Sequence, residues 1–95
     1  MIKLEKVVKK LKKIIGKEMN LMELEGYIQE AGDREFSDPY DYASVKDVVK
    51  ECGIGYNLTE DSGVFAEFEI VEIKEPLEWA EMEDVIVKII KIDTF

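Results

Sequence analysis

Two stretches in the second half of the chain decide its fold: VFAEFEIVEIK at residues 64–74 and DVIVKIIKIDTF at residues 84–95. Both are rich in β-branched and aromatic residues, and in both the apolar and polar side chains largely alternate with a period of two. This pattern is typical of strands that bury one face. We therefore expect the two stretches to pair as a long antiparallel hairpin.

The charges of the two stretches predict how they pair. An antiparallel register in which the paired residue numbers sum to 160 joins opposite charges twice and apolar residues twice. The pairs are Glu72 with Lys88, Glu69 with Lys91, Phe68 with Ile92 and Ile73 with Val87. Because opposite charges stabilise a ladder when they face each other across it, we expect this register.

Each stretch changes its apolar face at one place, at Ile70-Val71 and at Ile89-Ile90. A regular hairpin would therefore be apolar on a different side at each end. Two explanations are open. Matched bulges, or helices on both sides of the sheet, bring both halves into one core. Alternatively, one half packs on the helices of its own chain and the other on a second copy, which makes the hairpin a homodimer interface.

The first half of the chain is typical of helices. Apolar residues recur at helical spacing before Gly16, at Leu4, Val7, Val8, Leu11, Ile14 and Ile15. A second helix is expected over residues 21–31, with Asn20 and Glu23 as a capping box and Gly32 at its exit. Its apolar stripe consists of Leu21, Leu24 and Ile28. A third begins either near Asp38-Pro39 or at Ser44 with Asp47, and its apolar face consists of Val45, Val48, Val49 and Cys52.

A short strand at residues 54–58 and a turn at residues 59–63 follow the third helix. Cys52 is expected to be a small core residue, because no base can be placed beside it to lower its pKa. Together these elements predict one domain over residues 1–95 of the α+β class. Three N-terminal helices pack on a small antiparallel sheet that the C-terminal hairpin dominates.

Composition excludes most familiar enzymes. The chain has no histidine and one cysteine, so its own residues cannot build a Ser-His-Asp triad, a Cys-His pair, an ordinary zinc site or an internal disulfide. We expect no catalytic residue, no metal and no cofactor. Because no signal-peptide core and no apolar stretch of membrane-spanning length occurs, we expect a cytoplasmic protein that does not bind membranes.

Charge is unevenly distributed over the chain, whose net charge is -9. Residues 1–17 hold seven lysines and one acid, a net of +6, whereas the rest holds six bases and 21 acids, a net of -15. The lysines are expected to form a solvated helix face. The acidic remainder repels phosphate and favours basic partners, so we expect no specific nucleic-acid binding and a basic surface of another protein as the partner.

Acidic residues gather around aromatic ones in two segments. The candidate partner-binding residues are Asp38, Tyr40, Asp41 and Tyr42 in the first segment, and Glu75, Glu78, Trp79, Glu81, Glu83 and Asp84 in the second. Carboxylates beside aromatic rings can engage a basic partner. The alternatives are solvated loop charge, and a Trp79 that closes the core together with Leu77 and Met82 on a short helix from Pro76.

Residues 81–91, EMEDVIVKIIK, resemble the second half of the metal-binding signature of MazG-type nucleotide pyrophosphohydrolases, a Glu-x-x-Asp followed by an apolar helix with a base four residues after the Asp. The resemblance implies that Glu81 and Asp84 bind Mg²⁺ and that this end is helical. The family's Glu-x-x-Glu motif could only be Glu69 to Glu72, within a predicted strand. The order of three helices and a hairpin also resembles a winged-helix domain, which would use Lys46 and Lys50.

The function expected from these observations is a small acidic protein-interaction module. It occupies a basic, nucleic-acid-binding surface of a partner, as phage-encoded inhibitors of host nucleases do by imitating nucleic-acid charge. An Mg²⁺-dependent nucleotide hydrolase and a winged-helix-like nucleic-acid binder are the alternatives.

Overall fold

The long hairpin forms the middle of a four-stranded antiparallel sheet in the computed structural model, which describes residues 3–37 and 44–95. Its strands are β3 (Gly63–Ile73) and β4 (Val85–Thr94). The edge strands are β1 (Glu18–Asn20), which pairs with β4, and β2 (Gly53–Asn57), which pairs with β3. The predicted α+β class, with three helices and a dominant C-terminal hairpin, is confirmed.

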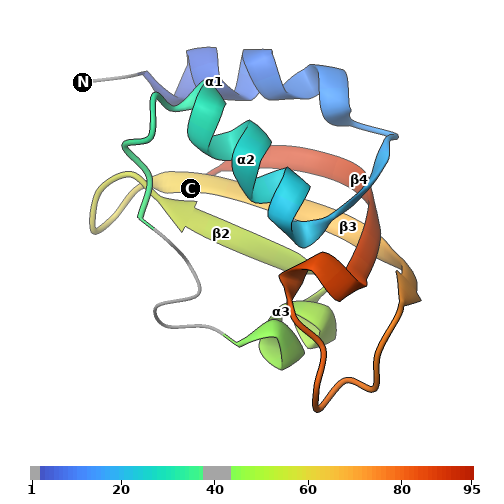
Figure 1. The fold of residues 1–95 in the computed structure, drawn as a ribbon. Coiled ribbons are helices and arrows are strands. Elements are labelled where there is room, and N and C mark those ends of the chain that lie inside the picture. The colour runs from blue at the N-terminus through green and yellow to red at the C-terminus, as the bar shows by residue number, and fades with distance from the viewer. Residues whose placement is uncertain (1–2, 38–43) are drawn as a thin grey trace.

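Two helices cover one side of this sheet. α1 (Leu4–Leu11) continues into a short 3-10 helix, η1 (Lys12–Ile14), and lies beside α2 (Leu21–Ala31), as Figure 1 shows. α3 (Val45–Glu51) lies next to the beginning of β2. The side of the sheet that α1 and α2 cover is called the inner face below, and the opposite side the outer face.

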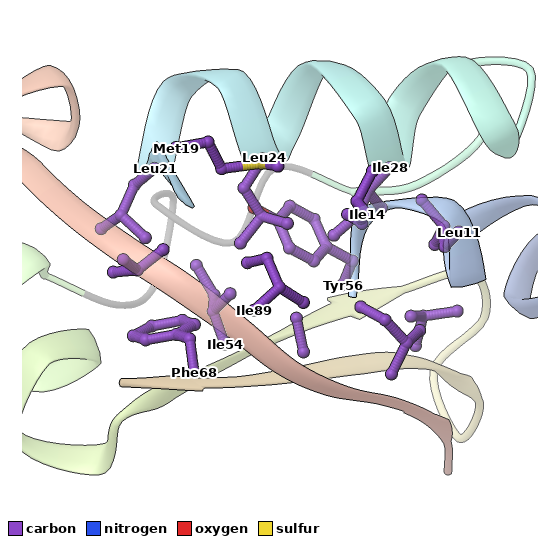
Figure 2. Packing of buried hydrophobic residues seen from close by; sticks show 14 of the residues in the cluster. Leu11, Ile14, Met19, Leu21, Leu24, Ile28, Ile54, Tyr56, Phe68 and Ile89 are labelled. Carbon is purple, nitrogen blue, oxygen red and sulfur yellow. The ribbon is translucent and has the colours of Figure 1, made fainter. Parts of the chain in front are cut away.

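The hydrophobic core fills the space between the helices and the inner face (Figure 2). Leu24 and Ile28 of α2 point toward the sheet, where Tyr56 of β2 and Ile89 of β4 are fully buried. Burial of large side chains such as these is the main term that stabilises a domain of this size. The helical spacing of the apolar residues thus correctly predicted which side of α2 is buried.

The predicted capping box of α2 is present, and α3 also begins with a capping box. In α2 the Glu23 N–H donates to Asn20 Oδ1 at 2.8 Å, and the Asn20 N–H donates back to Glu23 Oε1 at 3.2 Å. In α3 the Asp47 N–H donates to Ser44 Oγ at 3.2 Å. The later of the two predicted starts of the third helix is therefore present, and the earlier one, Asp38-Pro39, lies outside the described residues.

The predicted register of the hairpin is wrong: none of the four expected pairs is present, although two other Glu–Lys pairs are. The observed partners are Glu67 with Lys91 and Glu69 with Lys88. The glutamates are two positions apart on β3 and the lysines are three positions apart on β4, so an unbroken ladder cannot pair both. β4 therefore contains one extra residue, Ile90, between the two pairs. The prediction failed because it assumed a ladder without irregularities.

A second bulge lies further along β3, where Val71 is the extra residue. The two bulges fall at the two places where the sequence changes its apolar face. Beyond each bulge the apolar side chains return to the inner face, so that Phe68 on one strand and Val85, Ile89 and Ile92 on the other all belong to one core. The explanation by matched bulges is confirmed, and the change of face requires no second copy.

Three details differ from the sequence-based prediction. Ile15 is exposed, because η1 ends at Ile14 and the chain then turns at Gly16, where φ is +87°. Cys52 is exposed and not part of the core, because it ends α3 in a left-handed conformation with φ of +53°. β1 was not predicted at all, because three residues between two helices are too few to show an alternating pattern.

Candidate functional site

The loop between β3 and β4, residues 74–84, is held in place by its own backbone. The Lys74 N–H donates to the Asp84 carbonyl at 2.9 Å and closes the loop at its base. The N–H groups of Trp79 and Ala80 both donate to the Pro76 carbonyl, at 2.8 and 3.0 Å. These bonds form a tight turn that fixes the position of the loop's aromatic residue.

A short 3-10 helix, η3 (Met82–Asp84), returns the chain to β4. Its first turn is closed by a capping box, in which the Glu81 N–H donates to Asp84 Oδ2 at 2.9 Å. Glu81 and Asp84 therefore hold the loop together in addition to carrying charge. This structural role was not expected from the sequence, where the two residues are candidates for binding a partner or, by the resemblance to MazG-type enzymes, Mg²⁺.

Trp79 points away from the core. Its side chain is 74% exposed, the largest fraction among the described large apolar residues, whereas Ala80 and Met82 pack partly against the core. The alternative in which Trp79 closes the core is therefore wrong. In a monomer, an exposed tryptophan leaves a large apolar surface in water, which is unfavourable unless the surface is covered by something else.

Acidic side chains surround this tryptophan in the chain. Glu75, Glu78, Glu81 and Glu83 are exposed and Asp84 is half-buried. The loop thus combines carboxylates with one ring on a firmly bonded support. The other predicted cluster, Asp38, Tyr40, Asp41 and Tyr42, lies outside the described residues. Of its neighbours, Phe36 is buried in the core, and Asp33 and Glu35 are exposed.

The outer face of the sheet is a second surface, which sequence analysis missed. Phe65 lies over Gly53 and Gly55 of β2, and Phe95 lies near Gly55 and Gly63. Both rings remain partly exposed, at 38% and 49%. The signal in the sequence was a pair of glycines two residues apart, Gly53 just before the predicted strand and Gly55 within it, because such glycines leave space for a ring from the neighbouring strand.

Charged side chains occupy the middle of this face. Glu67 and Glu69 are exposed on β3, and their partners Lys91 and Lys88 are exposed on β4. Lys91 Nζ lies 3.2 Å from Asp93 Oδ2. This hydrogen bond, with one from the Thr94 N–H, lowers the pKa of Asp93 below its ordinary value.

The described residues form no site for either alternative function, the Mg²⁺-dependent nucleotide hydrolase or the winged-helix-like nucleic-acid binder. In residues 3–37 and 44–95, no group of three or more carboxylate or cysteine side chains is arranged to hold a metal ion. Residues 85–91, which the resemblance to MazG-type enzymes implies to be helical, belong to strand β4. Lys46 and Lys50 are exposed on α3. No helix in the described ranges has the length and apolar character to cross a membrane.

Comparison with known proteins identifies no relative. No family model matches the chain, and neither the curated proteins nor the solved structures contain a significant match.

Proposed function

We propose that this protein is an acidic interaction module that binds a basic surface of a partner protein through the loop of residues 74–84, with Trp79 as the anchor. The observation that carries the proposal is the 74% exposure of Trp79 on a loop that its own hydrogen bonds hold in place. Tryptophan is enriched among the residues that dominate binding energy at interfaces.

The rigidity of the loop supports this role. A binding loop that is already ordered loses less conformational entropy when it docks. The bonds from Trp79 and Ala80 to Pro76, and the capping box of Glu81 with Asp84, provide this order before any partner arrives.

The charge of the loop supports a basic partner. Glu75, Glu78 and Glu83 are exposed and flank the anchor in the sequence, and complementary charge accelerates association with a basic surface. Surfaces that bind nucleic acid are basic for the same electrostatic reason. A nucleic-acid-binding surface that this protein blocks is therefore the form of partner we propose. We place the interaction in the cytoplasm, where an exposed thiol such as that of Cys52 stays reduced.

Capture of partners by the tagged protein, with three variants, tests this proposal. Trp79→Ala removes the ring, and we expect an almost unchanged melting temperature with loss of capture, because an exposed anchor contributes to binding and not to folding. Glu78→Lys/Glu83→Lys reverses two exposed loop charges but spares the capping box. We expect it to weaken capture most at low salt, where charges are least screened.

The matched control is Glu60→Lys/Asp61→Lys. It makes the same change in net charge on the exposed turn between β2 and β3, away from the loop. A captured protein that is retained by the control but lost with both loop variants, and that elutes with nucleic acid as competitor, supports the proposal. If the control and the loop reversal reduce capture equally, only net charge matters and the proposed site is wrong.

A further inference from the structure

We propose that a second copy of this chain packs on the outer face of the hairpin, related to the first by a two-fold axis parallel to the strands. This inference goes beyond the proposed function and is independent of it, because it uses the outer face and not the loop of residues 74–84.

The first observation is the apolar surface that the outer side of the hairpin leaves in water. Phe65 and Ile90 are 38% exposed, and Val71 and Phe95 are 48% and 49% exposed. α1 and α2 lie on the inner face, so neither covers these side chains. Both bulges add to this surface, because Val71 and Ile90 are the two extra residues.

The second observation is that the charges in the middle of this face form two short rows of opposite sign, with Asp93 beyond them near the end of β4. The acids Glu67 and Glu69 stand on β3, and the bases Lys91 and Lys88 stand beside them on β4. Among the described residues no ion pair joins one row to the other, and Lys91 is paired with Asp93 of its own strand. Glu67, Glu69 and Lys88 are therefore open to charges from another molecule, whereas Lys91 would have to exchange or share Asp93.

Symmetry then selects the occupant and its orientation. A two-fold axis that runs parallel to the strands, between two stacked sheets, places β3 of each copy over β4 of the other. Each acidic row then faces the partner's basic row, with Glu67 over Lys91 and Glu69 over Lys88. An axis across the strands would instead stack β3 on β3 and bring like charges together, which is unfavourable. Only the first arrangement makes this face complementary to itself.

The area of the outer face of the hairpin determines how strongly two copies are expected to associate. The hairpin strands contain 11 and 10 residues, so the hairpin presents a strip about 35 Å long and about 10 Å wide. Two such strips cover about 700 Å² in total, which is below the range of stable specific complexes, so only weak association is expected. We therefore expect a monomer–dimer equilibrium with a dissociation constant in the micromolar range, about 10–100 μM.

Sedimentation analysis over a range of concentrations tests the face. All proteins carry Cys52→Ser, so that oxidation of the exposed thiol cannot imitate association. We expect Val71→Lys/Ile90→Lys to weaken the dimer at least about tenfold, because both side chains are placed in the interface. The control is Met22→Lys, which changes a comparably exposed apolar residue of α2 and should leave the dimer intact. Circular dichroism verifies that each variant is folded, and Phe95→Glu is a second interface variant.

Exchange of the two charge rows tests the axis. In the variant Glu67→Lys/Glu69→Lys/Lys88→Glu/Lys91→Glu, opposite charges still face each other within the hairpin and between two copies of the variant. A mixed dimer with the wild type places acids over acids and bases over bases. We expect native mass spectrometry to show the variant dimerising with itself but not with the wild type.

Three results would overturn the inference. One is a wild-type chain that remains monomeric at about 1 mM, well above the expected dissociation constant. Another is a dimer that survives Val71→Lys/Ile90→Lys and Phe95→Glu in folded proteins. The third is free mixing of the row-exchanged variant with the wild type.

Discussion

Replacement by alanine of two glycines on the outer face of the sheet, Gly63 and Gly55, should change the stability of the fold in opposite directions. At Gly63 a Cβ would overlap the carbonyl oxygen of Tyr56, lie 3.0 Å from Asn57 Cα and lie 2.7 Å from Phe95 Cζ. Two of these three neighbours are backbone atoms. At Gly55 the nearest atoms are ring carbons of Phe95 and Phe65 at 3.5–3.7 Å, which is ordinary van der Waals contact.

The size of each change in unfolding free energy depends on whether the atoms near the new Cβ can move away. Gly63 is bonded to Phe95 in both directions, N–H to carbonyl, at 3.1 Å each, so its backbone cannot retreat without breaking the ladder. We therefore expect Gly63→Ala to cost about 2–3 kcal/mol of unfolding free energy, the upper part of the range for overpacking. Gly55→Ala should instead gain about 0.5–1 kcal/mol, because glycine loses more backbone entropy than alanine in a strand.

Thermal unfolding of the two variants against the wild type measures this difference. In a domain of this size about 1 kcal/mol moves the melting temperature by roughly 4–8 °C, so the variants should differ by more than about 10 °C. Equal melting temperatures for the two variants would refute the reasoning. A Gly55→Ala variant less stable than Gly63→Ala would show that Phe65 and Phe95 do not lie where the structure places them.

Four further outcomes are expected. Ile28→Ala should cost about 2–5 kcal/mol, measured by urea unfolding, because it leaves a cavity in the middle of the core. Asn20→Ala should cost about 1 kcal/mol in the same assay through loss of the cap of α2. Cys52 should react with a thiol reagent in the folded protein as fast as in the unfolded one. By NMR, the pKa of Asp93 should lie below its ordinary value and rise in Lys91→Ala. Since the folded pKa is the lower one, the stabilisation from Asp93 is present above the unfolded pKa and is lost as pH falls through the folded pKa.

Local signals in the sequence predicted the elements well. The limits of α2 were correct because Asn20 and Gly32 mark them chemically, through a side-chain cap and a residue that favours helix exit. The hairpin was correct because β-branched residues alternate over most of its length. Neither signal depends on residues far away in the chain.

The predictions that failed concern features that depend on residues far apart in the sequence. The register of the hairpin could not be derived, because a bulge is recognised only when both strands are placed together, and Ile90 in isolation looks like any strand residue. β1 forms only because β4 offers it a free edge. Whether Trp79 points into the core or into solvent could not be predicted for the same reason. Its exposure depends on the turn at Pro76 and on which of its neighbours reach the core.

The two bulges of the hairpin act like a pair of compensating frameshifts. An extra residue in a strand moves every side chain that follows it to the opposite face of the sheet. Val71 alone or Ile90 alone would therefore displace the remaining pairs by one residue. Because one extra residue lies on each strand, the second bulge restores the register that the first one shifts. Ala66 with Ile92 and Ile73 with Val85 follow the same register, and only the three pairs from Phe68 to Ile70 are shifted by one residue. Removal of both residues together leaves every other side chain on the face it now occupies. Removal of either one alone shifts all the pairs on one side of the deletion, so this hairpin can gain or lose length only in matched steps.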